Sequence, residues 1–171
     1  MFGLTHSDND AIELLKSDHE EVDLMFKTYE SGKDEMKPAE KRRLALDICQ
    51  ALTVHATIEE EIFYPTVRKR SKEIQELVEE AAVEHQTLKD IIGRLEEAPA
   101  SDPLYDAGVK VLSEYVKHHV KEEESELFPK VRSTDLDLEA LGKRMIERKA
   151  ELDPESARPL SNEAYAEAVA S

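Results

Sequence analysis

The stretch "HATIEEEIFYP" spans residues 55–65, and a close copy, "HVKEEESELFP", spans residues 119–129. Each copy carries a His, a Glu four places later, and an aromatic residue followed by Pro at its end. The repetition extends upstream, where His19 and His85 precede the two copies at nearly the same offset. In a helical protein, such an internal repeat is typical of a bundle made of two paired halves.

The composition favours a helical domain of ordinary size. The chain has 171 residues, of which 40% are apolar, enough to bury a core in one domain with a short extension. It contains 5 Gly, 7 Pro and no Trp, while Ala, Leu, Glu and Lys dominate. This composition is typical of helices around an aliphatic core, so we expect an all-α fold.

The charge of the chain argues against polyanionic partners. It has 39 acidic and 23 basic residues and a net charge of −16, and such a surface repels DNA and anionic lipid. We therefore expect no nucleic acid and no membrane as partners. Cys49 is the single cysteine, which excludes an internal disulfide and indicates a packing residue. Without a signal-peptide pattern or an apolar run of transmembrane length, the sequence predicts a cytoplasmic protein. We expect it to be a monomer or a weak dimer.

Apolar residues recur at helical spacing in four long segments. These segments are expected at about residues 10–30, 38–69, 71–97 and 103–132. Pro65 and Pro129 should kink or end the second and fourth of them. We predict an up-down-up-down antiparallel four-helix bundle over residues 1–132, followed by a short C-terminal helix and a partly ordered tail over residues 133–171.

Six polar residues fall on the apolar stripes of these helices, where a core side chain is expected. They are His19, His55, Glu59, His85, His119 and Glu123. Burying an unpaired carboxylate costs several kcal/mol, so such positions need a strong compensating partner. With a rise of about 1.5 Å per residue, antiparallel neighbours bring all six to a common level. Four imidazoles and two carboxylates suit a site for two metal ions, and a symmetric set with room for an oxygen bridge favours iron over zinc.

The ordered set His, His-x-x-x-Glu, His, His-x-x-x-Glu resembles the hemerythrin-like, or HHE cation-binding, family. The motifs that carry the resemblance are "SDHEEVDLMF" around His19, "VEHQTL" around His85 and the two repeated strings, and it covers about residues 10–132. The resemblance implies a bundle with a non-haem di-iron centre of Fe2+ or Fe3+. It further implies that His19 and His55 hold one iron, that His85 and His119 hold the other, and that Glu59 and Glu123 bridge them beside an oxo or hydroxo group.

The sequence departs from oxygen-carrying hemerythrin at Lys89, where the carrier has a further His one turn after His85. Two histidines per iron would leave a vacant place on both irons, which favours turnover of peroxide or nitric oxide over reversible storage of O2. Tyr115 and Asp23 lie one turn from a predicted ligand, so either could fill a vacancy, and the Tyr115 phenol could instead donate a hydrogen bond to a bound oxidant. Alternatively, Tyr115 is a core tyrosine and Asp23 a solvated acid.

The resemblance implies binding of, or reaction with, hydrogen peroxide, dioxygen or nitric oxide, as in oxidative stress. Whether the protein is an enzyme, with catalase- or peroxidase-like or nitric-oxide-handling activity and an external electron donor, stays open at this point. The alternative is a non-catalytic iron or oxygen sensor, or an iron-storage or repair module, in which the segment from Leu136 reports the state of the metal. A purely structural bundle is disfavoured by the acids on the inner stripes.

The remaining polar and aromatic residues of the motifs are expected to have minor roles. Tyr64 and Phe128 are expected to pack at the end of the bundle, and His118 to be exposed or to touch a ligand. His6 is expected to be idle. The acids expected to point outward, with one of them able to hydrogen-bond a ligating His, are Glu60, Glu61, Glu122 and Glu124.

Overall fold

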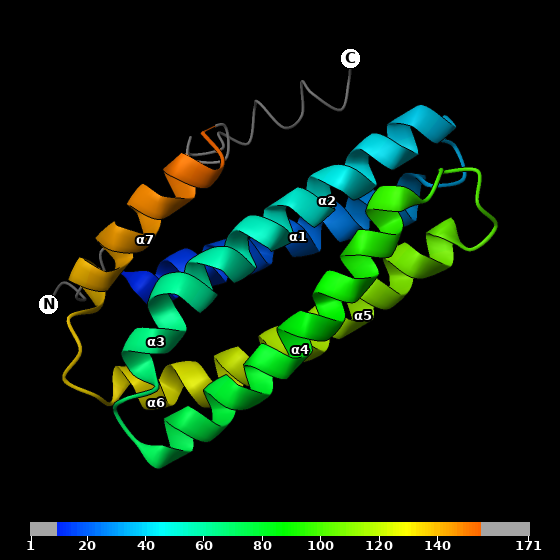
Figure 1. Cartoon of the computed structure of the whole chain (residues 1–171). Helices are drawn as coiled ribbons and strands as arrows, with labels where there is room; N and C mark the ends of the chain where they lie inside the picture. Colours follow the sequence, from blue (N-terminus) through cyan, green and yellow to red (C-terminus); the bar gives the residue numbers. More distant parts are fainter. Residues whose placement is uncertain (1–9, 155–171) are drawn as a thin grey trace, which may run out of the picture.

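The computed structural model describes residues 10–154, and this part of the chain is helical with no strand (Figure 1). The four long helices are α1 (Ala11–Gly32), α2 (Pro38–Ile58), α4 (Lys72–Glu97) and α5 (Tyr105–Glu122). Each packs antiparallel to its neighbour along the chain, and α1 also packs against α5. The predicted all-α, up-down-up-down bundle is confirmed. His6 and the tail expected after the C-terminal helix lie outside the described residues.

The helices begin where the sequence supplies caps. The side chain of Asp10 accepts hydrogen bonds from the backbone N–H groups of Ile12 and Glu13 at the start of α1. Ser71 caps α4 in the same way. Pro38 occupies the first position of α2, where its missing N–H costs no hydrogen bond. These local signals explain why the helices start close to the predicted residues.

The Glu of each HxxxE motif is the first residue of a π-turn. The segments η1 (Glu59–Phe63) and η2 (Glu123–Leu127) connect α2 to α3 (Tyr64–Val67) and α5 to α6 (Phe128–Arg132). The N–H groups of Tyr64 and Phe128 bond five residues back, to the carbonyls of Glu59 and Glu123. The proline after each aromatic residue lacks an N–H and crowds the preceding turn, and the wider turn accommodates it. The helix therefore bends and continues, as α3 does after α2 (Figure 1).

The apolar core is divided into two clusters by a layer of polar residues. One cluster includes Ile58, Phe63 and Leu127 near the π-turns. The other includes Leu52 and Leu112 in the opposite half of the bundle, and Cys49 is buried among its members. The six predicted ligand residues lie in the polar layer between the clusters.

A fifth long helix, α7 (Leu138–Leu152), packs against α1 and α2 (Figure 1). Its side chains Leu141 and Met145 are buried in the core cluster near the π-turns. The predicted C-terminal helix is therefore present and lies on the bundle, while the predicted domain boundary at residue 132 stays a prediction. None of the helices within residues 10–154 is long and apolar enough to cross a bilayer.

Candidate metal centre

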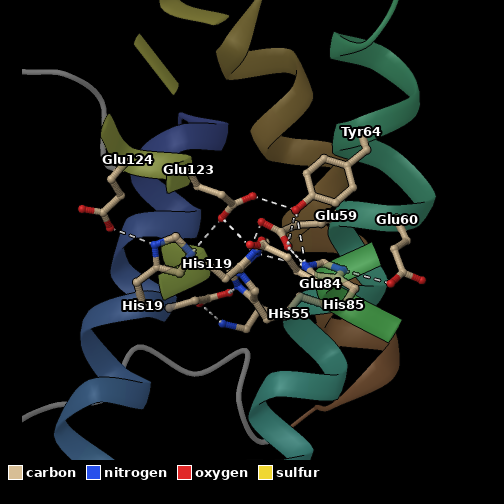
Figure 2. Close-up of polar contacts among 12 residues, drawn as sticks. His19, His55, Glu59, Glu60, Tyr64, Glu84, His85, His119, Glu123 and Glu124 are labelled. Atoms are coloured by element: carbon tan, nitrogen blue, oxygen red, sulfur yellow. Dashed lines mark hydrogen bonds and ion pairs between the residues drawn. The ribbon is translucent and has the colours of Figure 1, made fainter. Parts of the chain in front are cut away.

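The six predicted ligand residues meet in one buried layer of the bundle (Figure 2). They come from α1, α2, η1, α4, α5 and η2, which makes the cluster a product of the tertiary fold. Glu59 is fully buried, and the other five are at most 7% exposed. A cluster of ionisable groups with so little access to water needs internal compensation.

The four histidines form two close pairs. The ring centroids of His19 and His55 are 4.9 Å apart, and those of His85 and His119 are 4.7 Å apart. The Nε2 atoms of the second pair are separated by 3.1 Å. The pairs join neighbouring helices within each half of the sequence repeat, so each half supplies one pair.

Each glutamate spans both histidine pairs. The carboxylate oxygens of Glu59 lie 3.2 Å from His55 Nε2 and 3.2 Å from His85 Nε2. Glu123 Oε2 lies 3.3 Å from His19 Nε2 and 3.5 Å from His119 Nε2. Both carboxylates therefore connect one half of the repeat to the other, as bridging ligands between two ions would.

Several ligand-type atoms at the centre have no hydrogen-bond partner within the described residues. They are His19 Nε2, His55 Nε2, Glu59 Oε1 and Glu123 Oε2. These four residues each offer a ligand atom within 4.8 Å of the others, and Glu59, His85 and His119 form a second such group. Buried polar atoms are almost always satisfied in proteins, and an ion is one partner that satisfies them. The donor set fits a metal-cation site.

Each histidine is also held from outside by a carboxylate of another helix (Figure 2). The Nδ1 atoms contact Glu124 at 2.8 Å from His19, Asp18 at 3.1 Å from His55, Glu60 at 2.9 Å from His85 and Glu84 at 2.6 Å from His119. An Nδ1–H that donates to a carboxylate fixes the ring and turns Nε2 toward the centre. This outer ring of four carboxylates is the usual support of metal-binding histidines.

Sequence reasoning placed part of this outer ring wrongly. Glu60 and Glu124 were expected to point outward, with one of them at most on a histidine, yet both contact one. Asp18 and Glu84 were not singled out. The signal was present in the repeat, since an acid directly precedes the first His of each half and another directly follows Glu59 and Glu123.

The charges of the cluster compensate one another in the metal-free chain. Burial opposes the charged form of His55, but Glu59 and Asp18 outweigh it and raise the pKa of His55 well above its usual value. Glu59 and Glu60 likewise raise the pKa of His85 to about 9 against the effect of burial. In turn, His55 and His85 hold the pKa of Glu59 well below its usual value despite burial. Protonated imidazoles thus supply positive charge that a cation would otherwise bring.

Tyr64 reaches the centre, although it was expected to pack at the bundle end. Its hydroxyl donates to Glu123 Oε1 at 2.7 Å and lies 3.3 Å from both Glu59 Oε2 and His85 Nε2. The π-turn explains this placement, because a residue that closes an i to i+5 turn stacks over residue i, here Glu59. Burial and the two glutamates raise the pKa of Tyr64 well above its usual value, so the hydroxyl keeps its proton.

Phe128 occupies the place in the second half that Tyr64 occupies in the first. Its ring stacks on His19, with centroids 5.9 Å apart and an interplanar angle of 5°. It has no hydroxyl to offer. The cage, expected to be symmetric, therefore has a hydrogen-bond donor on one side and a hydrocarbon face on the other.

The two candidates for filling a vacancy lie away from the cluster. Tyr115 is 46% exposed, and Asp23 pairs with Lys27 on the surface of α1. Lys89 turns its ammonium group to Glu60 Oε2 at 2.6 Å and so supports the partner of His85. His118 is exposed and contacts Glu84 and Glu122.

A small apolar cavity adjoins the histidines. It has about 30 Å³ of space for the centres of water-sized molecules. Its walls combine the four histidines with Lys89 and with aliphatic side chains that include Val22, Leu52, Leu88 and Val116. One water molecule needs roughly 10–15 Å³ by this measure, so the cavity suits one or two small molecules.

The comparisons with known proteins agree with this site. The hemerythrin HHE cation-binding domain matches residues 10–131, and the chain therefore belongs to that family. A crystal structure of a hemerythrin HHE cation-binding domain-containing protein from Mycobacterium kansasii matches with a TM-score of 0.69 and 25% identity, covering 85% of this chain and 88% of that one. The family is a cation-binding one, and the His/Glu cluster fits a metal site.

A relative described as a DNA nickase, from Nostoc sp. (strain PCC 7120 / SAG 25.82 / UTEX 2576), is 30% identical over 133 residues. The match covers 77% of this chain and 36% of the relative, so the chain spans about a third of that protein.

Proposed function

We propose that the chain holds two iron ions and binds or reacts with a small oxidant, namely hydrogen peroxide, dioxygen or nitric oxide. The observation that carries this proposal is the set of buried histidine and glutamate atoms at the centre of the bundle that face one another without a hydrogen bond. His19 and His55 would hold one ion, and His85 and His119 the other. Glu59 and Glu123 would span both.

The pairing of the histidines supports two ions over one. A single ion draws its ligands toward one point, whereas here the imidazoles gather in two pairs that two glutamates connect. The four outer carboxylates hold each pair separately. A ligand set of imidazoles and carboxylates suits iron. A symmetric and partly open donor set also favours iron over zinc.

The surroundings support a small, uncharged reactant. The cavity beside the histidines is apolar and small, which favours a small reactant. On the other side, the Tyr64 hydroxyl is a buried proton donor beside both glutamates. Iron, when bound, supplies the redox chemistry, and an external donor would supply electrons. The chain itself orients the ligands, keeps bulk water out and holds a proton at Tyr64 Oη.

Metal analysis tests the proposal most directly. Protein loaded with ferrous iron should contain two irons per chain and consume hydrogen peroxide or react with nitric oxide. His119→Ala should lower the iron content and the reaction, while Lys117→Ala, which alters an exposed residue of the same helix, should change neither. A single zinc per chain, or equal effects of the two variants, would contradict the proposal, as would reversible O2 binding without either reaction.

A metal-sensing function is the second candidate, and one observation favours it. Lys149 of α7 contacts Asp18, the carboxylate that holds His55. A helix outside the four-helix repeat is thereby connected to a predicted ligand. Turnover of peroxide without any change in α7 would favour the enzyme, and a metal-dependent change in α7 without turnover would favour the sensor.

A further inference from the structure

A continuous line of contacts leads from α7 to the His19/His55 pair. Lys149 Nζ lies 2.6 Å from Asp18 Oδ1, and the other oxygen of Asp18 lies 3.1 Å from His55 Nδ1. Asp18 is 6% exposed, and the side chain of Lys149 is 14% exposed. The carboxylate is therefore shared between a cation of α7 and the imidazole of a predicted ligand, with little access to water.

The helix that supplies Lys149 lies beyond the segment that matches the family. That segment ends at residue 131, and α7 begins at Leu138. Leu141 and Met145 anchor α7 in the core, and Arg148 pairs with Glu61 of η1 at 2.7 Å. The docking of α7 thus combines an apolar contact, a surface ion pair and the buried contact to Asp18.

The equivalent carboxylates of the other histidine pair are supported from within the bundle. Glu84, which corresponds to Asp18 in the repeat, is met by His118 of α5 at 3.3 Å. Glu60 is met by Lys89 of α4 at 2.6 Å. Support from α7 therefore distinguishes the His55 side of the cluster from the His85/His119 pair.

We propose that Lys149 is a positioning residue for the ion held by His19 and His55, and that the docking of α7 is coupled to occupation of that place. This inference rests on the proposed two-ion site. Without Lys149, the buried carboxylate of Asp18 loses its cationic partner. The contact that fixes its orientation toward His55 is then lost. The His55 ring then loses the contact that directs its Nε2 to the centre.

Coupling of this kind is reciprocal. If docked α7 raises the metal affinity of one place, then metal in that place stabilises docked α7 by the same factor. Protection of α7 from hydrogen exchange should therefore increase when metal is added. The same addition should affect α4 and α5 less, because α7 packs mainly against α1, α2 and η1.

The test compares two cations of α7 that both reach the bundle. Lys149→Met removes the contact to Asp18, Arg148→Met removes the contact to Glu61, and Lys149→Arg restores a cation. Ferrous iron, and zinc as a redox-inert substitute, are titrated into the metal-free full chain against a chelator, and hydrogen exchange of residues 138–152 is followed with and without metal. Lys149→Met should weaken one of two ions about 10–100-fold and leave the other unchanged.

The control variants separate positioning from a general loss of stability. Arg148→Met should retain both affinities and the metal-dependent protection of α7, and Lys149→Arg should recover most of the lost affinity. Equal metal affinities of the Lys149→Met and Arg148→Met variants would overturn the inference. So would protection of α7 from hydrogen exchange that does not change when metal is added to the wild type. Failure of the wild type to bind two ions would instead refute the proposed function, and this inference with it.

Discussion

At the scale of single residues, Tyr64 and Phe128 make the two halves of the centre chemically different. Both follow a glutamate of the cluster by one π-turn, so both rings face a histidine. Tyr64 adds a proton donor beside Glu59 and Glu123, while Phe128 adds hydrocarbon. If the proposed function holds, an oxidant that needs a proton would find a donor on the His85 side and none on the His19 side.

The Tyr64→Phe variant should show the value of that hydroxyl. Glu123 loses a 2.7 Å hydrogen bond in a buried site, so the free energy of unfolding of the metal-free chain should fall by about 1–3 kcal/mol. The optical spectrum and the iron affinity of the loaded protein should change as well. The measurements are urea unfolding and an iron titration.

Tyr29→Phe is the matched control for this variant. Tyr29 belongs to the other core cluster and donates a 2.7 Å hydrogen bond to Asp106. It should lower stability but leave the iron affinity and spectrum unaltered. If both variants alter iron binding equally, or if neither does, Tyr64 has no special role at the centre.

The stability of the metal-free chain should fall between neutral and alkaline pH. The folded pKa of His85 is raised to about 9, mainly by Glu59 and Glu60 against burial, while the unfolded value is about 6.5. Its stabilising contribution is therefore complete below about pH 6.5 and is lost as pH rises through about 9, a change on the order of 3 kcal/mol. Urea unfolding in the presence of a chelator measures it.

Metal should reverse this trend. Histidine must be unprotonated to bind a metal, so the metal affinity of the centre increases with pH.

The prediction for the metal-free chain can also be contradicted. If its free energy of unfolding rises between about pH 6.5 and about 9, His85 is not held by the two glutamates as described.

At the scale of elements, the sequence predicted the helices better than their joints. Caps such as Asp10 and Ser71 and the apolar stripes are local signals, and so the helices and the six inward polar residues could be predicted. The π-turns could not be predicted, because a single widened turn is not visible in the α-helical spacing of the apolar residues. Tyr64 was misplaced for this reason. Asp18 and Glu84 were missed because the histidines they hold lie on other helices.

The start of α1 should be sensitive to the Asp10 side chain. Asp10 caps α1 and also lies 3.1 Å from Arg132 at the end of α6, so it connects the first and second halves of the repeat. Asp10→Ala should reduce the free energy of unfolding by about 1–2 kcal/mol. Asp10→Asn retains the cap and should reduce it less. Chemical unfolding checks both, and wild-type stability of Asp10→Ala would refute the capping argument.

At the scale of the whole molecule, the net negative charge leads us to expect no polyanionic partner. The net charge of −16 opposes the binding of phosphate backbones, which depends on Lys and Arg. We expect no shift of a DNA duplex in a gel at low salt and no nicking of supercoiled plasmid, with or without iron. This expectation differs from the description of the Nostoc relative, of which the chain spans about a third. A salt-sensitive gel shift would contradict it.

The crossed support of the histidines also has a consequence for how the chain can be divided. A cut in the loop at residues 68–71 would give two fragments, each with two of the histidines and one of the glutamates. The first fragment lacks Glu124, which holds His19, and the second lacks Glu60, which holds His85. Each fragment carries the missing part of the other. We therefore expect the two fragments to complement each other when mixed. Metal binding would report that they have assembled.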